Sequence, residues 1–203
     1  MFYFVASTRP WQGQLSLPGL ERNDLVFFAL FPEGSGARSA ARLAGKLRQS
    51  CGLRARPLAQ HRLHVSLHLL GQYDGVPNEI AAKTCKAASA IAAVPFRVTF
   101  DIAESWRRRQ GNAPLVLRSS DPAKSLFALY DALGEAMARD GLAGGGPRRS
   151  YLPHMTLLYD TGDVGPCEVE PVRWTVREFV LVHSRRGRTQ YATLARWPLS
   201  APA

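Results

Sequence analysis

The sequence predicts a domain of mixed helices and strands, organised as two similar lobes that meet at a cleft. Three observations lead to this expectation. The 203 residues include 46% hydrophobic and 21% charged side chains, which is ordinary usage for a globular chain with a sizeable core. Strand and helix patterns follow one another in the same order in both halves. A short sequence that contains histidine then recurs at the end of each pattern.

The first half is predicted to form a strand, a helix and a second strand. Residues 25–31 are an uninterrupted apolar run, which is typical of a buried strand. After a turn at Gly34, apolar residues keep a helical spacing up to Ser50. Residues 63–70 alternate apolar and polar side chains, so we expect a strand with one solvated face.

The rest of the chain is divided in the same way. Asp121 and Pro122 suit the N-cap and first position of a helix, and residues 1–24 lack any periodic pattern. We therefore expect an irregular N-terminal arm over residues 1–24 and a single bilobed domain over residues 25–203. The remaining helices are predicted over residues 79–94 and 123–139, and the remaining strands over residues 96–102, 115–117, 151–159, 174–182 and 189–197.

The two halves share a register. Leu25 precedes His64 by 39 residues, and Leu115 precedes His154 by the same 39 residues. A solenoid needs at least three repeats, so this pattern indicates one internal duplication. The two resulting lobes are expected to place corresponding strands on either side of a cleft.

The duplicated strands carry the same short motif. His-Val-Ser-Leu begins at His64, and His-Met-Thr-Leu begins at His154, 90 residues later. Residues i and i+2 of a strand point to the same face, so each lobe presents an imidazole beside a hydroxyl, Ser66 or Thr156. A lone histidine on a half-exposed strand is usually structural. Two copies in register favour a functional site.

Paired imidazoles and hydroxyls suit the hydrolysis of a phosphodiester. One group must take a proton from water while another protonates the leaving oxygen, and imidazoles can hold either state near neutral pH. The hydroxyls can donate hydrogen bonds to the non-bridging oxygens, where negative charge must be stabilised. This chemistry requires no metal ion.

At these motifs the sequence resembles the 2H phosphoesterases, which are named for two His-x-Thr/Ser-x motifs. It is most similar to the RNA 2',3'-cyclic phosphodiesterases, also known as 2'-5' RNA ligases. The resemblance covers about residues 23–199 and lies in residues 25–32, 64–71, 153–157, Tyr191 and residues 196–199. It implies a bilobed α+β fold, with two pseudo-symmetric lobes of antiparallel sheet, helices outside and a central active-site cleft.

The resemblance also implies an activity and its residues. The enzyme would be a phosphoric diester hydrolase that opens a terminal 2',3'-cyclic phosphate of RNA to a 2'-phosphate, without a cofactor or metal. His64 and His154 take the catalytic places, and Ser66 and Thr156 those of the phosphate-binding hydroxyls. The usual assignment makes the second histidine the base that activates water and the first the acid.

Further residues are candidates for substrate contact. His68 is expected on the same face as His64, and Trp106 and Tyr191 could stack on a base. Many relatives carry an arginine where this chain has Leu158-Tyr159, so the cation that contacts phosphate is expected to come from elsewhere. The candidates in loops are Arg188 and also Arg107, Arg108, Arg109, Arg148, Arg149, Arg185 and Arg186.

Composition limits which binding partners and which cellular compartment are expected. The formal net charge of +10 favours polyanionic partners such as an RNA end. The longest apolar run has seven residues, whereas a membrane-spanning helix needs about 20, so no membrane partner is expected. The N-terminus does not resemble a signal peptide, and the three cysteines are expected to be reduced. We expect a cytoplasmic monomer.

Three other functions are open at this point. His64 and His68 have the i, i+4 spacing of a helical metal site, although the alternation around them favours a strand. A binding module for nucleotides or RNA ends would need no turnover. A 2',5'-phosphodiesterase, a ligase of 2'-5' ends or an enzyme of cyclic nucleotides would use the same four motif residues.

Overall fold

The computed structural model describes residues 24–106, 111–142, 151–185 and 191–200, in which the chain forms eight β-strands, three α-helices and one short 3₁₀-helix. The strands are β1 (Asp24–Leu30), β2 (Val65–Tyr73), β3 (Phe96–Ser105), β4 (Ala113–Arg118), β5 (His154–Asp160), β6 (Cys167–Val176), β7 (Glu178–Ser184) and β8 (Tyr191–Pro198). The helices are α1 (Gly34–Ser50), α2 (Asn78–Ser89), α3 (Lys124–Arg139) and the 3₁₀-helix η1 (Gln60–Arg62).

The strands form one antiparallel sheet in the order β6-β3-β4-β5-β2-β1-β7-β8. Its two halves are joined where Val65 of β2 faces Met155 of β5. We call β2-β1-β7-β8 the first lobe and β5-β4-β3-β6 the second lobe. The unit β1-α1-β2 of the first lobe corresponds to β4-α3-β5 of the second, so the predicted duplication and α+β class are confirmed.

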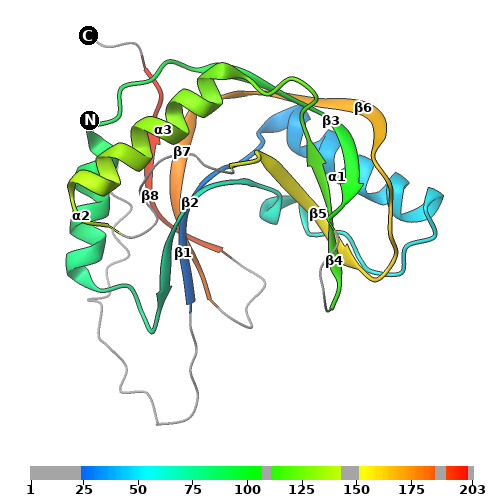
Figure 1. Cartoon of the computed structure of the whole chain (residues 1–203), viewed down its shortest axis with the longest axis horizontal. Helices are drawn as coiled ribbons and strands as arrows, with labels where there is room; N and C mark the ends of the chain where they lie inside the picture. The colour runs from blue at the N-terminus through cyan, green and yellow to red at the C-terminus, as the bar shows by residue number, and fades with distance from the viewer. Residues whose placement is uncertain (1–23, 107–110, 143–150, 186–190, 201–203) are drawn as a thin grey trace.

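The lobes exchange their helices (Figure 1). Helix α1 follows β1 of the first lobe but packs against β5 and β6 of the second. Helix α3 follows β4 of the second lobe but packs mainly against α2, and it contacts β2 of the first lobe as well as β3 of its own. Gly36 permits the approach of α1, because a Cβ there would lie 2.9 Å from the Cβ of Trp174 on β6. Each lobe thus covers part of the other's buried face.

The hydrophobic core is shared by both lobes. Phe28 and Phe179 of the first lobe and Phe100 of the second belong to one continuous cluster beneath the helices. A second, smaller cluster lies on the opposite face of the first lobe and contains Phe27, Ala29, Val180 and Val182. Phe31 and Tyr191 pack against this smaller cluster, which brings aromatic side chains to the face that the helices leave open.

Both motif strands contain a β-bulge at the same position. In β2, Ser66 faces Ala29 and Leu69 faces Phe27. Between these two pairs, β2 therefore contains one residue more than β1. In β5, a register shift against β4 follows Thr156 in the same way. An extra residue reverses which side chains face the core beyond it. The duplication therefore extends to the backbone irregularity after each motif.

The strand and helix predictions hold for most elements but differ at several ends. Helix α2 ends at Ser89 instead of residue 94, and the apolar Val94 is 50% exposed because no core covers it. The N-cap of α3 is Ala123, so the N-cap predicted at Asp121 is wrong.

The strand predicted over residues 174–182 is two strands, β6 and β7, separated at Arg177. The first part of β6 was missed because it alternates polar residues around Pro171, which an edge strand tolerates and a central strand does not.

The structure describes all three cysteine side chains. The three cysteines are free thiols, with Cys51 exposed. No helix in the described part of the chain is long and apolar enough to cross a membrane.

Candidate active site

The four motif side chains meet where the two lobes join. Val65 and Met155 face each other across β2 and β5, and both are completely buried in the core. Their strand neighbours point to the opposite face, so the antiparallel register sets His64 beside Thr156 and Ser66 beside His154. Diagonal neighbours in such a pair have their Cβ atoms about 7–8 Å apart. The two imidazoles therefore stand on the same open face at a separation that a phosphate group can span.

Both imidazoles are oriented by the same local hydrogen bond. Nδ1 of His64 donates to the carbonyl oxygen of Arg62 at 2.7 Å, and Nδ1 of His154 donates to that of Leu152 at 2.8 Å. A carbonyl only accepts, so the proton of each neutral ring lies on Nδ1 and the lone pair lies on Nε2. Nε2 of His64 lies 3.1 Å from the Ser66 hydroxyl. In both lobes Nε2 is therefore the ring nitrogen that can accept or donate a proton on the open face.

The surroundings of His64 are aromatic. Its ring centroid lies 5.2 Å from that of Phe27, 5.8 Å from that of Phe31 and 5.4 Å from that of Tyr191. The Arg62 guanidinium lies over the Tyr191 ring, 5.0 Å from its centroid. Tyr191, predicted to contact substrate, is thus next to His64.

The surroundings of His154 contain one aromatic ring and an ion pair. Trp106 lies with its ring centroid 4.2 Å from that of His154, so this predicted contact residue is also at the site. Its indole Nε1 donates to Glu104 at 2.8 Å, and the same carboxylate accepts a bond from Arg118 at 2.8 Å. Arg118 faces His154 across β4 and β5. Glu104 therefore holds both Trp106 and Arg118 in place.

Burial lowers the pKa of both candidate histidines. For His64, desolvation is the largest cause, and the positive charges of His154 and Arg62 lower its pKa further. For His154, desolvation again lowers the pKa, while the Leu152 carbonyl raises it. The electrostatic effect of His154 on His64 means that protonation of one ring disfavours protonation of the other. Once one ring is protonated, the pair therefore resists a second proton, which leaves one imidazole as an acid and the other as a base.

A column of stacked rings lies behind the site. Tyr151 stacks on Tyr130 of α3 at 3.8 Å, and Tyr130 stacks on His68 at 3.9 Å. The Tyr151 hydroxyl donates to the carbonyl oxygen of Ser66 at 3.0 Å. Burial raises the pKa of Tyr151, so this hydroxyl stays a donor. The bond ties the segment before His154 to the strand that carries Ser66.

The prediction that His68 shares the face of His64 and Ser66 is wrong. Its side chain is 2% exposed, and its Nε2 donates to the carbonyl oxygen of Tyr130 at 2.8 Å. The bulge in β2 is the reason, because the extra residue turns His68 toward α3. Leu158 occupies the position of the second motif that corresponds to His68. Its apolar side chain was the sequence signal that this position faces the core.

The helical metal pair of His64 and His68 is also excluded by this geometry, because the two side chains point to opposite faces of β2. Across the described residues, the structure has no group of three or more His, Cys, Asp or Glu side chains that could hold a metal ion.

The remaining predicted contacts are arginines. Arg188 lies outside the described residues, as do the other loop candidates at 107–109, 148–149 and 186. Arg185 is described and exposed. Sequence reasoning missed Arg62 and Arg118, which lie next to the two imidazoles. Only the strand register, or the position of Arg62 two residues before His64, could have indicated them.

Comparison with known proteins agrees with this architecture. The family model of the 2'-5' RNA ligase superfamily matches residues 35–188. The RNA 2',3'-cyclic phosphodiesterase of Escherichia coli (strain K12) is 33% identical over 153 residues, a match that covers 71% of this chain and 80% of that protein.

Solved structures show the same fold. The crystal structure of E. coli LigT complexed with 3'-AMP matches with a TM-score of 0.69 and 27% identity, and the match covers 89% of this chain and 99% of that chain. The crystal structure of TT0787 of Thermus thermophilus has a TM-score of 0.69 at 20% identity over 88% of this chain and 100% of that chain, which shows a shared fold. With the matched family model and the E. coli relative, these findings show that the chain belongs to the 2'-5' RNA ligase superfamily.

Proposed function

We propose that this protein is an RNA 2',3'-cyclic phosphodiesterase, which hydrolyses a terminal 2',3'-cyclic phosphate to a 2'-phosphate by acid–base catalysis between His64 and His154. The observation that carries the proposal is the pairing of the two motifs across β2 and β5, with both Nε2 atoms available on one open face. The named activity of the E. coli relative supports the choice of substrate.

The reaction needs two proton transfers at one phosphorus atom. One imidazole accepts a proton from water through Nε2 as the water oxygen bonds to phosphorus. The other imidazole donates its Nε2 proton to the ribose 3'-oxygen as the bond from phosphorus to that oxygen breaks. The phosphate stays on the 2'-oxygen. Exchange of protons with solvent then restores one acid and one base.

The hydroxyls of Ser66 and Thr156 stabilise the charge that develops on phosphorus. In the antiparallel register each hydroxyl neighbours the imidazole of the other lobe, so a phosphate between the imidazoles meets a donor from each strand. Donors fixed on strands need little reorganisation during the reaction, which is the condition for strong electrostatic stabilisation.

The direct test is product analysis with a nucleoside 2',3'-cyclic phosphate and with a short RNA that ends in one, both in the presence of EDTA. We expect the 2'-monophosphate as the product, identified by chromatography against both isomers or by phosphorus NMR. A 3'-phosphate product would show that the 2'-oxygen is the leaving group, which contradicts the proposal. Loss of activity in EDTA would contradict metal-independent catalysis. Binding of both compounds without turnover would support a binding module.

The dependence of kcat/KM on pH is expected to be a bell whose maximum lies below pH 6.5, the ordinary pKa of histidine. Activity falls at low pH when the base gains a proton, and at high pH when the acid loses one. Because burial lowers both pKa values, both limbs shift to lower pH than two exposed histidines would give. Initial rates at low substrate concentration measure this profile.

An Arg62→Met variant serves as the internal check on that profile. Arg62 lowers the pKa of His64 through its positive charge, so its removal is expected to shift one limb to higher pH. Arg139→Met removes an exposed arginine on α3 and is expected to leave both limbs in place. A flat wild-type profile between about pH 5 and 8 would contradict a pair of titrating imidazoles.

A further inference from the structure

A basic groove lies outside the four-residue site. It is open, has a volume of about 490 Å³ and is formed by the start of α1, the start of β3 and the end of β6. Its lining residues are Glu33, Gly34, Ser35, Arg97, Arg173, Trp174, Thr175 and Arg177. Three guanidinium groups against one carboxylate make it a strongly positive feature.

The three arginines are available for a ligand. Arg97, Arg173 and Arg177 are all exposed, and none of them forms an ion pair or side-chain hydrogen bond with another residue in the described ranges. Elsewhere in the structure, Arg118 and Arg196 are paired with carboxylates. The groove therefore concentrates positive charge that the acidic side chains of the described residues leave without an ion pair.

Two of the arginines lie on the face of the sheet opposite the core. Arg97 faces Thr175 and Arg173 faces Thr99 across β3 and β6, so these four side chains share one face. Along the strands they alternate with buried core residues. Those core residues are Val98 and Phe100 on β3 and Val172 and Trp174 on β6.

The motif residues of the second lobe lie on the same face. His154 is in register with Arg118 and Ile102, beside a buried row formed by Met155 and its partners Leu117 and Ala103. This buried row and the core residues of β3 and β6 belong to one continuous core. His154 and the groove arginines therefore lie on the same side of the sheet, opposite the core, with a register shift of the β3–β6 pair between Phe100 and Ile102 separating them.

A site residue and a groove residue are close neighbours in the sequence. The Phe31 ring lies against His64, with 5.8 Å between the ring centroids. Glu33, only two residues later, lines the groove together with the first residues of α1. Two extended residues span at most about 7 Å, so the groove begins close to the aromatic wall of the site.

Guanidinium groups on an open, polar surface suit phosphodiester groups. Arginine binds phosphate through two parallel N–H donors, and contacts to the backbone hold a nucleic acid in register without reading its sequence. For a substrate whose terminal phosphate is between the two imidazoles, the open face offers a path for the preceding nucleotides toward these arginines.

We propose that this groove binds the sugar-phosphate backbone of the nucleotides that precede the reacting end of an RNA substrate. The inference rests on the proposed function, because it takes the cyclic end to be held at His64 and His154. Beyond that function, the groove would give the enzyme a preference for RNA chains over mononucleotides, and this preference would not depend on base sequence.

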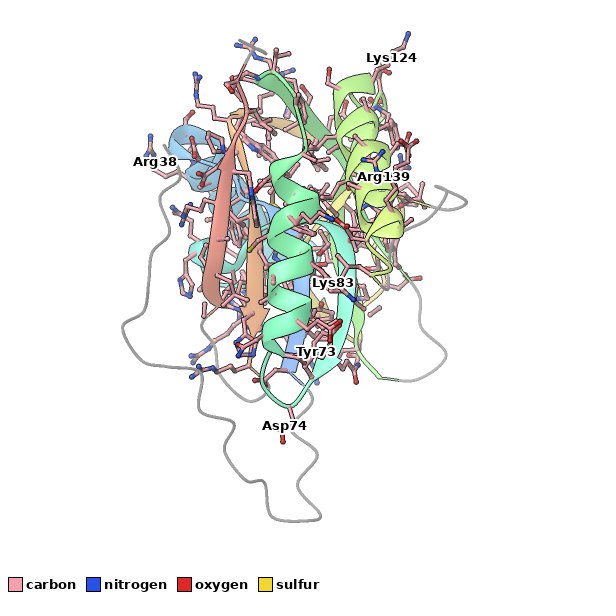
Figure 2. All side chains as sticks on the ribbon, turned by 90° about the vertical axis from the view of Figure 1, so that its left-hand side faces the viewer. Arg38, Tyr73, Asp74, Lys83, Lys124 and Arg139 are labelled. Atoms are coloured by element: carbon pink, nitrogen blue, oxygen red, sulfur yellow. The ribbon has the colours of Figure 1, made fainter. Side chains whose placement is uncertain are left out.

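The test compares two doubly substituted proteins of equal net charge. The groove variant is Arg97→Gln with Arg173→Gln. The control is Lys124→Gln with Arg139→Gln, whose side chains are exposed at the two ends of α3 (Figure 2). Both are assayed on a nucleoside 2',3'-cyclic phosphate and on a short single-stranded RNA with the same end.

For the groove variant, we expect the ratio of kcat/KM for the RNA to kcat/KM for the mononucleotide to fall about tenfold, while the control keeps the wild-type ratio. The slope of log kcat/KM for the RNA against log salt concentration should become shallower by about 1.4, from about 0.7 for each lost phosphate contact to a single strand. An unchanged ratio, or an equal fall in the control, would overturn the inference.

A binding measurement separates this inference from the proposed function. Fluorescence anisotropy of the same RNA, labelled at its 5' end and ending in a 2'-phosphate, is expected to show weaker binding to the groove variant than to wild type and control. If the wild-type protein turned over neither substrate, the proposed function would be wrong. Equal binding of the RNA to all three proteins would contradict the inference that the groove binds RNA, whether or not turnover is seen.

Discussion

Replacement of either His64 or His154 by alanine is expected to lower kcat for a 2',3'-cyclic phosphate by about 10²–10⁴-fold, the usual contribution of a positioned general acid or base. Each imidazole presents Nε2 on the open face because its Nδ1 is bonded to a backbone carbonyl. Alanine removes the proton carrier and leaves the strand intact, so KM should change much less than kcat. Steady-state kinetics with the cyclic substrate measure both.

His61→Ala is the matched control for these variants. His61 is exposed and lies three residues before His64, so its replacement should leave kcat unchanged. The double variant of His64 and His154 should lose little more than the worse single variant, because the two groups act together in one step. Wild-type kcat in either single variant, with a fold unchanged by circular dichroism, would contradict the assigned roles.

An aryl phosphodiester substrate identifies the acid within the pair. A 4-nitrophenolate leaves without protonation, so loss of the general acid should cost little with it, whereas loss of the base should remain severe. The resemblance to the 2H phosphoesterases makes His64 the acid. In the free site the positive charge of Arg62 lowers the pKa of His64, and this effect favours the opposite order. The variant that is rescued by the activated substrate is the one that lacks the acid.

The second large effect is expected from the hydroxyls. Thr156→Ala and Ser66→Ala should each lower kcat by about 10²–10³-fold, the loss that follows removal of one oxyanion-hole donor in acyl transfer. Ser66 has a second contact, since its hydroxyl lies 3.1 Å from Nε2 of His64. Its removal should therefore also alter the pH profile of kcat/KM, which Thr156→Ala should leave in place.

Thr156→Ser and Ser66→Thr are the conservative partners of these variants. Each keeps a hydroxyl donor on the same face of its strand and changes only a methyl group, so activity should stay within a few-fold of wild type. Equal activity of the alanine variants and the conservative variants would contradict a role of these hydroxyls at the phosphate.

Much of this site could be read from local patterns. The alternation around each motif predicts a strand with His64 and Ser66, or His154 and Thr156, on one face, and the structure has these strands. The common spacing of 39 residues predicts the duplication of strand, helix and strand. These inferences succeed because the two-residue period of a strand is a property of neighbouring residues, which sequence records directly.

Other features depended on contacts between distant segments. The His68 prediction failed because a bulge in β2 turned the side chain to Tyr130, and the bulge is defined only against β1. The Tyr151 bond to Ser66 joins residues 85 positions apart. Arg118 reaches the site because β4 pairs with β5 in one register. Local sequence contains no record of such registers.

The sequence by itself therefore determined the two motifs, their faces and their duplication. The tertiary structure alone decided that β2 and β5 adjoin, which brings motifs 90 residues apart into one site, and that α1 and α3 cross to opposite lobes. The physical reason is that strand pairing and helix packing are chosen by the burial of the shared core, a property of the whole chain that no short segment contains.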